Sequence, residues 1–157
     1  MIQKFKVSFM GIVTLIACAF LTSCGDDDNE SGEIYKTGVH KIVVEQSGDT
    51  DAFALEVSFG ASSIGASAKL YNDAGEYVGE TYGVTMDKAK ASCYTGDNAI
   101  YMTCSGAVHN IIDEPGKKLK VIVTAYINDK EVNRLTKEYE TAQEDLIETF
   151  RVSTTTE

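Results

Sequence analysis

The segment Phe53-Ala54-Leu55-Glu56-Val57-Ser58-Phe59 decides the fold of this chain. Large apolar side chains occupy every second position, and small or charged side chains occupy the positions between them. Because successive side chains of a β-strand point to opposite faces, this alternation predicts a strand with one buried face. A single strand cannot bury such a stripe, so other parts of the chain must cover it.

The body of the chain from Ile34 onward repeats this alternation. A second strong stripe is formed by alternate residues of segment 119–127, namely Leu119, Val121, Val123, Ala125 and Ile127. Weaker strands are predicted at 39–44, 66–71, 77–84, 99–104, 132–139 and 146–152. Turn-forming residues fall between them at 47–49, 72–75, 96–98, 115–116 and 128–129. Short, regularly spaced strands joined by such turns are typical of an antiparallel sandwich or barrel.

We therefore expect an all-β domain, a single antiparallel β-sandwich of immunoglobulin-like type with about 7–8 strands. A small lipocalin-like β-barrel is the alternative, and the strand count does not separate the two. The segment 136–150 is rich in helix-forming residues, and a short helix there is a local alternative. We predict strands, because Leu146, Phe150 and Val152 also fit an alternating pattern.

Length and composition limit the classes of protein to which the chain can belong. It has 157 residues, of which 43% are hydrophobic, and this fits one ordinary folded domain rather than a disordered protein. The 24 acidic residues outnumber the 14 basic ones, and the formal net charge is -10. A nucleic acid is bound mainly through clustered Lys and Arg, so we expect no nucleic-acid partner.

The N-terminal segment has the pattern of an export signal. Lys4 and Lys6 precede an almost uninterrupted apolar run over residues 7–21. A membrane-spanning helix needs about 20 apolar residues, and this run ends earlier at small and acidic residues. An export signal is therefore predicted over residues 1–23.

The end of this signal, Leu21-Thr22-Ser23-Cys24, resembles the lipobox of bacterial lipoproteins. The resemblance implies that signal peptidase II cleaves before Cys24 and that Cys24 carries a thioether-linked diacylglycerol. An ordinary secretory signal with a nearby cysteine is the alternative. Acyl chains anchor a protein to a bilayer, each buried methylene contributing about 0.8 kcal/mol.

The residues that follow, Gly25, Asp26, Asp27 and Asp28, resemble the acidic export tag of Bacteroidota-type lipoproteins. The resemblance implies a lipoprotein of the outer membrane, exposed at the cell surface. A flexible acidic tether facing the periplasm has the same composition and stays open. We expect a signal peptide over 1–23, a lipidated tether over 24–33 and the sandwich over 34–157. Loss of 1–23 removes Lys4 and Lys6 and no acid, which takes the net charge from -10 to -12.

Cys93 and Cys104 are the two cysteines that remain after Cys18 is removed and Cys24 is lipidated. An even pair in an exported protein predicts a disulfide bond. The turn residues of 96–98 lie between them, so the bond is expected to cross a hairpin. Two separate buried thiols are the alternative.

Residue patterns for catalysis or metal binding are sparse. The two histidines, His40 on a predicted strand and His109 near a loop, stand alone, and motifs for a nucleophile, a phosphate loop or a zinc protease do not occur. Asp49 and Asp51 in a turn are the one hint of calcium, and Asp is common in turns without an ion. We therefore expect no enzyme activity, no catalytic residues, no cofactor and no metal.

Tyrosines give the best hint of a binding surface. Five of the eight gather in the middle third of the chain, at Tyr71, Tyr77, Tyr82, Tyr94 and Tyr101. Tyrosine supplies a large contact area with a polar tip, although it is also common in sheets. We expect a lipid-anchored, non-catalytic binding module with a protein or glycan partner. A barrel that carries a small ligand or inhibits an envelope protein is the alternative.

Overall fold

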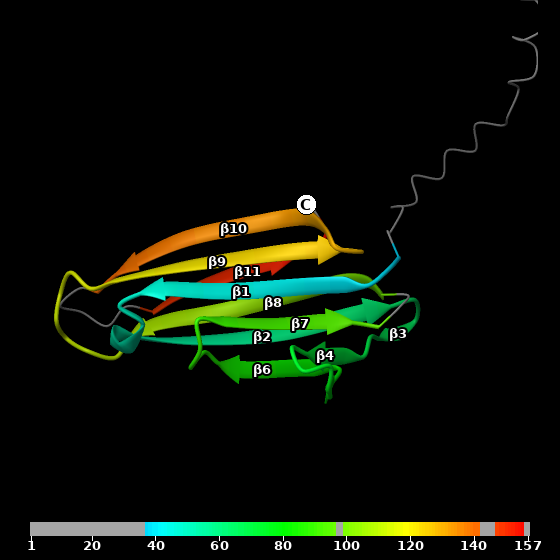
Figure 1. Cartoon of the computed structure of the whole chain (residues 1–157), viewed down its shortest axis with the longest axis horizontal. Coiled ribbons are helices and arrows are strands. Elements are labelled where there is room, and N and C mark those ends of the chain that lie inside the picture. The colour runs from blue at the N-terminus through cyan, green and yellow to red at the C-terminus, as the bar shows by residue number, and fades with distance from the viewer. Residues whose placement is uncertain (1–36, 97–98, 142–146, 156–157) are drawn as a thin grey trace, which may run out of the picture. The chain divides into compact units, whose positions relative to one another are not determined.

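The computed structural model of the chain describes residues 37–96, 99–141 and 147–155 (Figure 1). Within these residues, the regular elements are eleven strands and one short 3-10 turn, η1 (Thr50–Ala52). The strands form two antiparallel sheets, and neither sheet closes on itself. The predicted all-β sandwich is confirmed, and the closed lipocalin-like barrel is wrong.

The first sheet has six strands in the order β10-β9-β1-β7-β4-β5. They are β10 (Lys130–Glu140), β9 (Lys118–Ile127), β1 (His40–Gly48), β7 (Lys90–Thr95), β4 (Leu70–Asn72) and β5 (Tyr77–Gly79). The second sheet has five strands, with β11, β8, β2 and β3 in order and β6 also paired with β2. Their bounds are β11 (Ile147–Ser153), β8 (Ala99–Asn110), β2 (Phe53–Ser63), β3 (Ala66–Ser67) and β6 (Thr81–Thr85).

The decisive segment forms the first part of β2, between β8 and β6. Its alternation is observed directly: the four large apolar residues of the segment are buried, whereas Glu56 and Ser58 are exposed. Buried residues of the other sheet join the same core, among them Ile42, Val44, Leu119, Val121, Val123 and Ala125. Burial of each large apolar side chain contributes roughly 1.5–3 kcal/mol, so the two stripes hold the sheets together.

Most connections carry the chain from one sheet to the other, among them those between β5 and β6 and between β7 and β8. β5 belongs to the first sheet and β6 to the second, and only Glu80 separates them. The change of direction follows Gly79, whose φ of 119° is rarely adopted by residues with a side chain. β7 and β8 also lie in different sheets. The predicted hairpin through 96–98 is therefore wrong.

The two ends of the sandwich carry different connections. At the proximal end, which contains residues 38–40, Asn128 and Asp129 form the β9–β10 turn with φ values of 50° and 62°. Two positive φ values are typical of a two-residue type I′ hairpin. The connections β1–β2, β6–β7 and β8–β9 lie at the opposite, distal end (Figure 1). A tether that precedes residue 37 therefore leads into the proximal end.

Most predicted strands are observed, with extended bounds. Segments 66–71 and 77–84 each divide into two short strands, and β7 was not predicted, so the strands outnumber the expected 7–8. Strands are also observed at both ends of segment 136–150, as predicted. There β10 continues to Glu140 and β11 begins at Ile147. Residues 142–146 lie outside the described residues.

Tyr139 on β10 gives a prediction about stability. The residue is 3% exposed, and its hydroxyl is a buried atom without a hydrogen-bond partner among the described residues. Burial raises the pKa of this hydroxyl to about 12. Because Tyr139→Phe removes an uncompensated polar group, we expect the free energy of unfolding to rise by about 1 kcal/mol. Urea unfolding of both proteins measures the change, and a less stable variant contradicts the prediction.

Candidate functional site

The residues of the predicted lipid anchor lie outside the described part of the chain. They are Cys24 and the tag Gly25, Asp26, Asp27 and Asp28. Lipidation and surface export therefore stay predictions from the sequence. Among the described residues, the structure contains no helix with the length and apolar character needed to cross a membrane.

Cys93 on β7 and Cys104 on β8 face the same core from opposite sheets. Both are buried free thiols in this structure. Burial raises the pKa of each thiol to about 12, and Cys93 adds to the shift at Cys104 because the two groups are close enough to interact electrostatically. The disulfide is not formed here and stays a prediction. If formed, it joins the two sheets rather than the two strands of a hairpin.

Three tyrosines come together on the outer side of the six-stranded sheet. Tyr71 on β4 stacks on Tyr94 of β7 with 5.6 Å between ring centroids, and it meets Tyr77 of β5 edge-on at 6.0 Å. The Nζ atom of Lys69 lies 6.0 Å from the centre of the Tyr77 ring. Tyr77 is 57% exposed, which leaves much of its ring open to a partner. We call Lys69, Tyr71, Tyr77 and Tyr94 the tyrosine face.

Hydrogen bonds hold the β4–β5 connection beneath this face. The Asp73 carboxylate accepts hydrogen bonds from the backbone N–H and the hydroxyl of Ser92 on β7. The Asn72 side-chain oxygen accepts hydrogen bonds from the backbone N–H groups of Ala74 and Glu76, both at 3.0 Å. Asp and Asn side chains commonly order turns in this way. The turn that presents Tyr77 is therefore fixed at both ends.

The tyrosine face continues across the sheet through strand register. Tyr71 pairs with Tyr94, Tyr94 with Lys41 on β1, and Lys41 with Tyr126 on β9. Cross-strand neighbours lie side by side on one face of a sheet. Half-buried aromatic rings therefore flank Lys41 on both sides, and the row extends from the edge of the sheet toward its centre.

The other two predicted tyrosines lie on the five-stranded sheet. Tyr82 on β6 stacks on the buried ring of Phe59 at 6.1 Å and packs against the core. Tyr101 on β8 accepts a hydrogen bond from Arg151. The prediction that all five tyrosines lie together is therefore wrong for Tyr82 and Tyr101. The sequence could not show it, because the chain changes sheets between β5 and β6, returns between β6 and β7, and changes again between β7 and β8.

The structure gives the histidines and the Asp49 turn structural neighbours. His40 is fully buried at the start of β1, and its Nδ1 atom lies 2.7 Å from the Thr154 hydroxyl. His109 is half-buried on β8. The Asp49 carboxylate accepts a hydrogen bond of 2.8 Å from the Lys118 N–H, and Asp51 is exposed. Within residues 37–96, 99–141 and 147–155, the structure has no group of three His, Cys, Asp or Glu side chains that could hold a metal ion.

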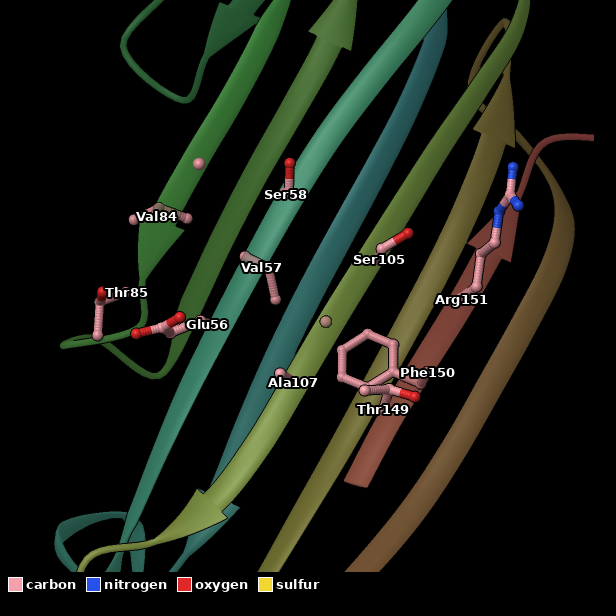
Figure 2. Close-up of a pocket in the computed structure, with 12 residues that line it drawn as sticks. Glu56, Val57, Ser58, Val84, Thr85, Ser105, Ala107, Thr149, Phe150 and Arg151 are labelled. Atoms are coloured by element: carbon pink, nitrogen blue, oxygen red, sulfur yellow. The ribbon is translucent and has the colours of Figure 1, made fainter. Parts of the chain in front are cut away.

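A groove of about 850 Å³ lies on the five-stranded sheet, over β6, β2, β8 and β11. Its first row of paired residues is Gly83, Ser58, Ser105 and Arg151, and the adjacent row is Thr85, Glu56, Ala107 and Thr149. Figure 2 shows Glu56 and Thr85 at one side and Arg151 at the other, with the two serines between them. The floor is low because Gly83, Ala107 and the serines have small side chains.

Sequence reasoning did not identify this groove. The signal was present in the exposed positions of two strand segments, where Ser58 and Ser105 alternate with buried neighbours. Their meeting depends on the register of β2 with β8, which pairs these two serines directly. No local pattern specifies that register, because it brings together residues far apart in the chain.

Comparisons with known proteins identify relatives of this sandwich. No family model matches the chain, and no curated protein matches it. A DUF4425 family protein from Bacteroides ovatus ATCC 8483, known from a crystal structure, is 55% identical in sequence to this chain. The match covers 77% of this chain and 98% of that chain, with a TM-score of 0.75. A DUF4425 domain of unknown function from Bacteroides vulgatus ATCC 8482 is also 55% identical, covering 76% and 96% of the two chains, with a TM-score of 0.73.

A more distant relative is the calcium-bound form of a protein from Parabacteroides distasonis, determined by NMR. It is 26% identical, with 80% of this chain and 99% of that chain covered and a TM-score of 0.57. The fold defines an antiparallel β-sandwich domain. The identity to the two Bacteroides proteins assigns the chain more narrowly, and it belongs to the DUF4425 family.

Proposed function

We propose that this protein is a lipid-anchored, non-catalytic interaction module of the outer membrane that binds a protein partner through its tyrosine face. The anchor is Cys24, and the tag Gly25 to Asp28 directs the module to the cell surface. Two of its relatives come from Bacteroides, which agrees with the Bacteroidota type of the predicted tag. The proposal requires no catalytic group and no cofactor.

The exposed ring of Tyr77 is the observation that carries this proposal. Aromatic side chains bury a large area at low entropic cost and are enriched among the residues that dominate binding energy at interfaces. The stack with Tyr71 and Tyr94 and the fixed β4–β5 connection hold this ring before a partner arrives. Preorganisation lowers the entropy lost on binding, which favours recognition over a purely structural role.

Photocrosslinking in intact cells tests this proposal. The variant Tyr77→p-benzoylphenylalanine keeps an aromatic ring at the site and reacts with a molecule in contact with it. We expect one discrete adduct at position 77, and we expect Tyr71→Ala in the same chain to remove it because the stack is lost. The matched control places the same group at Lys120, an exposed residue of the same sheet far from the tyrosines. An equal adduct at both positions, or none at position 77, contradicts the proposal.

Calcium binding is a second candidate function, favoured by the calcium-bound relative from Parabacteroides distasonis. Exposed acids lie on the β1–β2, β6–β7 and β8–β9 connections of the distal end, among them Asp51, Asp87, Asp113 and Glu114. Oxygen-rich loops are the usual setting for calcium. Within the described residues, no three His, Cys, Asp or Glu side chains form a group that could hold an ion, so calcium bound here would also take carbonyl oxygens or water as ligands.

A thermal melt of the full-length protein with added CaCl2 tests this candidate. At a calcium concentration 100 times the Kd, we expect a gain of about 2.7 kcal/mol in stability. Asp51→Asn should reduce the gain, and Asp129→Asn at the proximal end should leave it unchanged. An unchanged melting temperature in calcium, or equal shifts with calcium and magnesium, contradicts specific calcium binding.

A further inference from the structure

We propose that the groove on the five-stranded sheet is a second binding site, one that takes a neutral carbohydrate chain. The site lies on the opposite sheet from the tyrosine face and does not depend on it. Its volume of about 850 Å³ is in the range of ligand sites in proteins.

Four hydroxyl groups line the groove, and they are available to a ligand. Within the described residues, the hydroxyls of Ser58, Thr85, Ser105 and Thr149 have no protein hydrogen-bond partner. Some buried hydroxyls of the domain serve the fold instead: that of Thr141 donates to the Glu114 carbonyl, and that of Thr154 accepts from the Met102 N–H. A hydroxyl both donates and accepts, so it matches the hydroxyl groups of a sugar.

The charges of the groove favour a neutral ligand. The groove has one acid, Glu56, and one base, Arg151, so it carries no net charge although the chain has a formal net charge of -10. The Arg151 guanidinium is held in place, donating from Nη2 to the Tyr101 hydroxyl at 2.9 Å and from Nε to the Thr103 hydroxyl at 3.2 Å. Its remaining N–H groups can donate to a ligand. A polyanion would meet a single opposing charge at Arg151 and a polycation a single one at Glu56, so neither would find a row of matching charges.

The backbone of the groove disfavours an extended peptide. Peptides that add to a sheet need an exposed strand edge with free N–H and C=O groups. The floor consists of the paired strands β2 and β8, which bond to each other, so the floor presents side chains, and the free strand edges of β6 and β11 lie only at the sides of the groove. Gly83, Ala107 and the serines are too small to enclose peptide side chains, and the apolar part of the lining is limited to Val57, Val84, Phe150 and these small residues. A polyhydroxylated chain lying across the sheet fits this surface better.

Isothermal titration of the full-length lipoprotein in detergent micelles tests this inference. The neutral probes are maltohexaose, cellohexaose and mannohexaose; the comparison probes are a hexamer of galacturonate and an uncharged Gly-Ser-Thr peptide. We expect at least one neutral hexasaccharide to bind with a submillimolar Kd. The double variant Ser58→Ala, Ser105→Ala should weaken it at least tenfold, because two hydrogen-bonding groups are removed.

Two controls separate the groove from other effects. Ser47→Ala removes an exposed hydroxyl from the other sheet and should leave the affinity unchanged. Melting temperatures of all variants show that they are folded. The inference is overturned if no neutral hexasaccharide binds at millimolar concentration, if the serine variant binds as tightly as the natural protein, or if the galacturonate or the peptide binds more tightly.

Discussion

Replacement of Cys24 by Ala will remove the lipid from this protein and release it from the membrane fraction. We expect this to be the largest effect of any single substitution, because the proposed anchor depends on one sulfur atom. A lipoprotein carries more than one acyl chain, and each buried methylene contributes about 0.8 kcal/mol to membrane binding. Fractionation of cells with an antibody against the domain measures the location. Fatty-acid labelling measures the lipid directly and distinguishes an anchored protein from one that keeps its signal peptide.

Cys18→Ala is the matched control for this experiment. Cys18 lies in the apolar run of the signal and is lost with residues 1–23, so the variant should keep both its label and its place in the membrane. A Cys24→Ala protein that still takes up fatty acid would contradict the lipobox prediction. Equal loss of label in both variants would indicate impaired export instead of a specific lipidation site.

Oxidation of Cys93 and Cys104 to a disulfide will produce the second large effect, a gain in stability of about 3 kcal/mol. The estimate follows from closing a loop of about a dozen residues in the chain-entropy model. The bond would join β7 of one sheet to β8 of the other through the core. Urea unfolding of protein isolated from the cell envelope, with and without reductant, measures the gain. The double variant Cys93→Ala, Cys104→Ala cannot form the bond. Its stability in urea should therefore be the same with and without reductant.

The thiols must be counted under denaturing conditions. Burial raises the pKa of both groups to about 12, so the folded protein holds very little thiolate at neutral pH whether or not a bond has formed. Freshly exported protein should therefore be unfolded in the presence of an alkylating agent and then weighed by mass spectrometry. Modification of neither Cys93 nor Cys104 before reduction, and of both afterwards, is the expected result. Modification of both without reductant contradicts the disulfide.

The sequence predicted the sheets better than the way in which the chain connects them. The stripe from Phe53 to Phe59 and the stripe from Leu119 to Ile127 identified one central strand in each sheet, because alternation is a local consequence of burial. The β9–β10 turn at Asn128 and Asp129 was also predictable from residue type. A connection that crosses between sheets has no comparable local signal. Turn residues are needed whether the next strand lies in the same sheet or in the other one.

The missed strand β7 shows this limit clearly. Residues 90–95 contain a lysine, an alanine, a serine and a threonine, and their burial comes from pairing with β1 and β4 rather than from a strong apolar stripe. Without β7, the turn at 96–98 read as a hairpin, and the cysteines and Tyr94 were placed with the wrong neighbours. The three tyrosines and the groove depend on register between distant segments, so only the folded chain reveals them.

Protease treatment of intact cells tests whether the sandwich is displayed at the cell surface, because a surface interaction module must be accessible to protease from outside. A known periplasmic protein serves as the control for leakage, and the lipid-bearing peptide that remains is identified by mass. We predict that the sandwich is removed from intact cells and that a lipidated fragment beginning at Cys24 stays in the membrane. Protection of the sandwich until the outer membrane is opened would contradict surface display and leave Asp26 to Asp28 as a periplasmic tether.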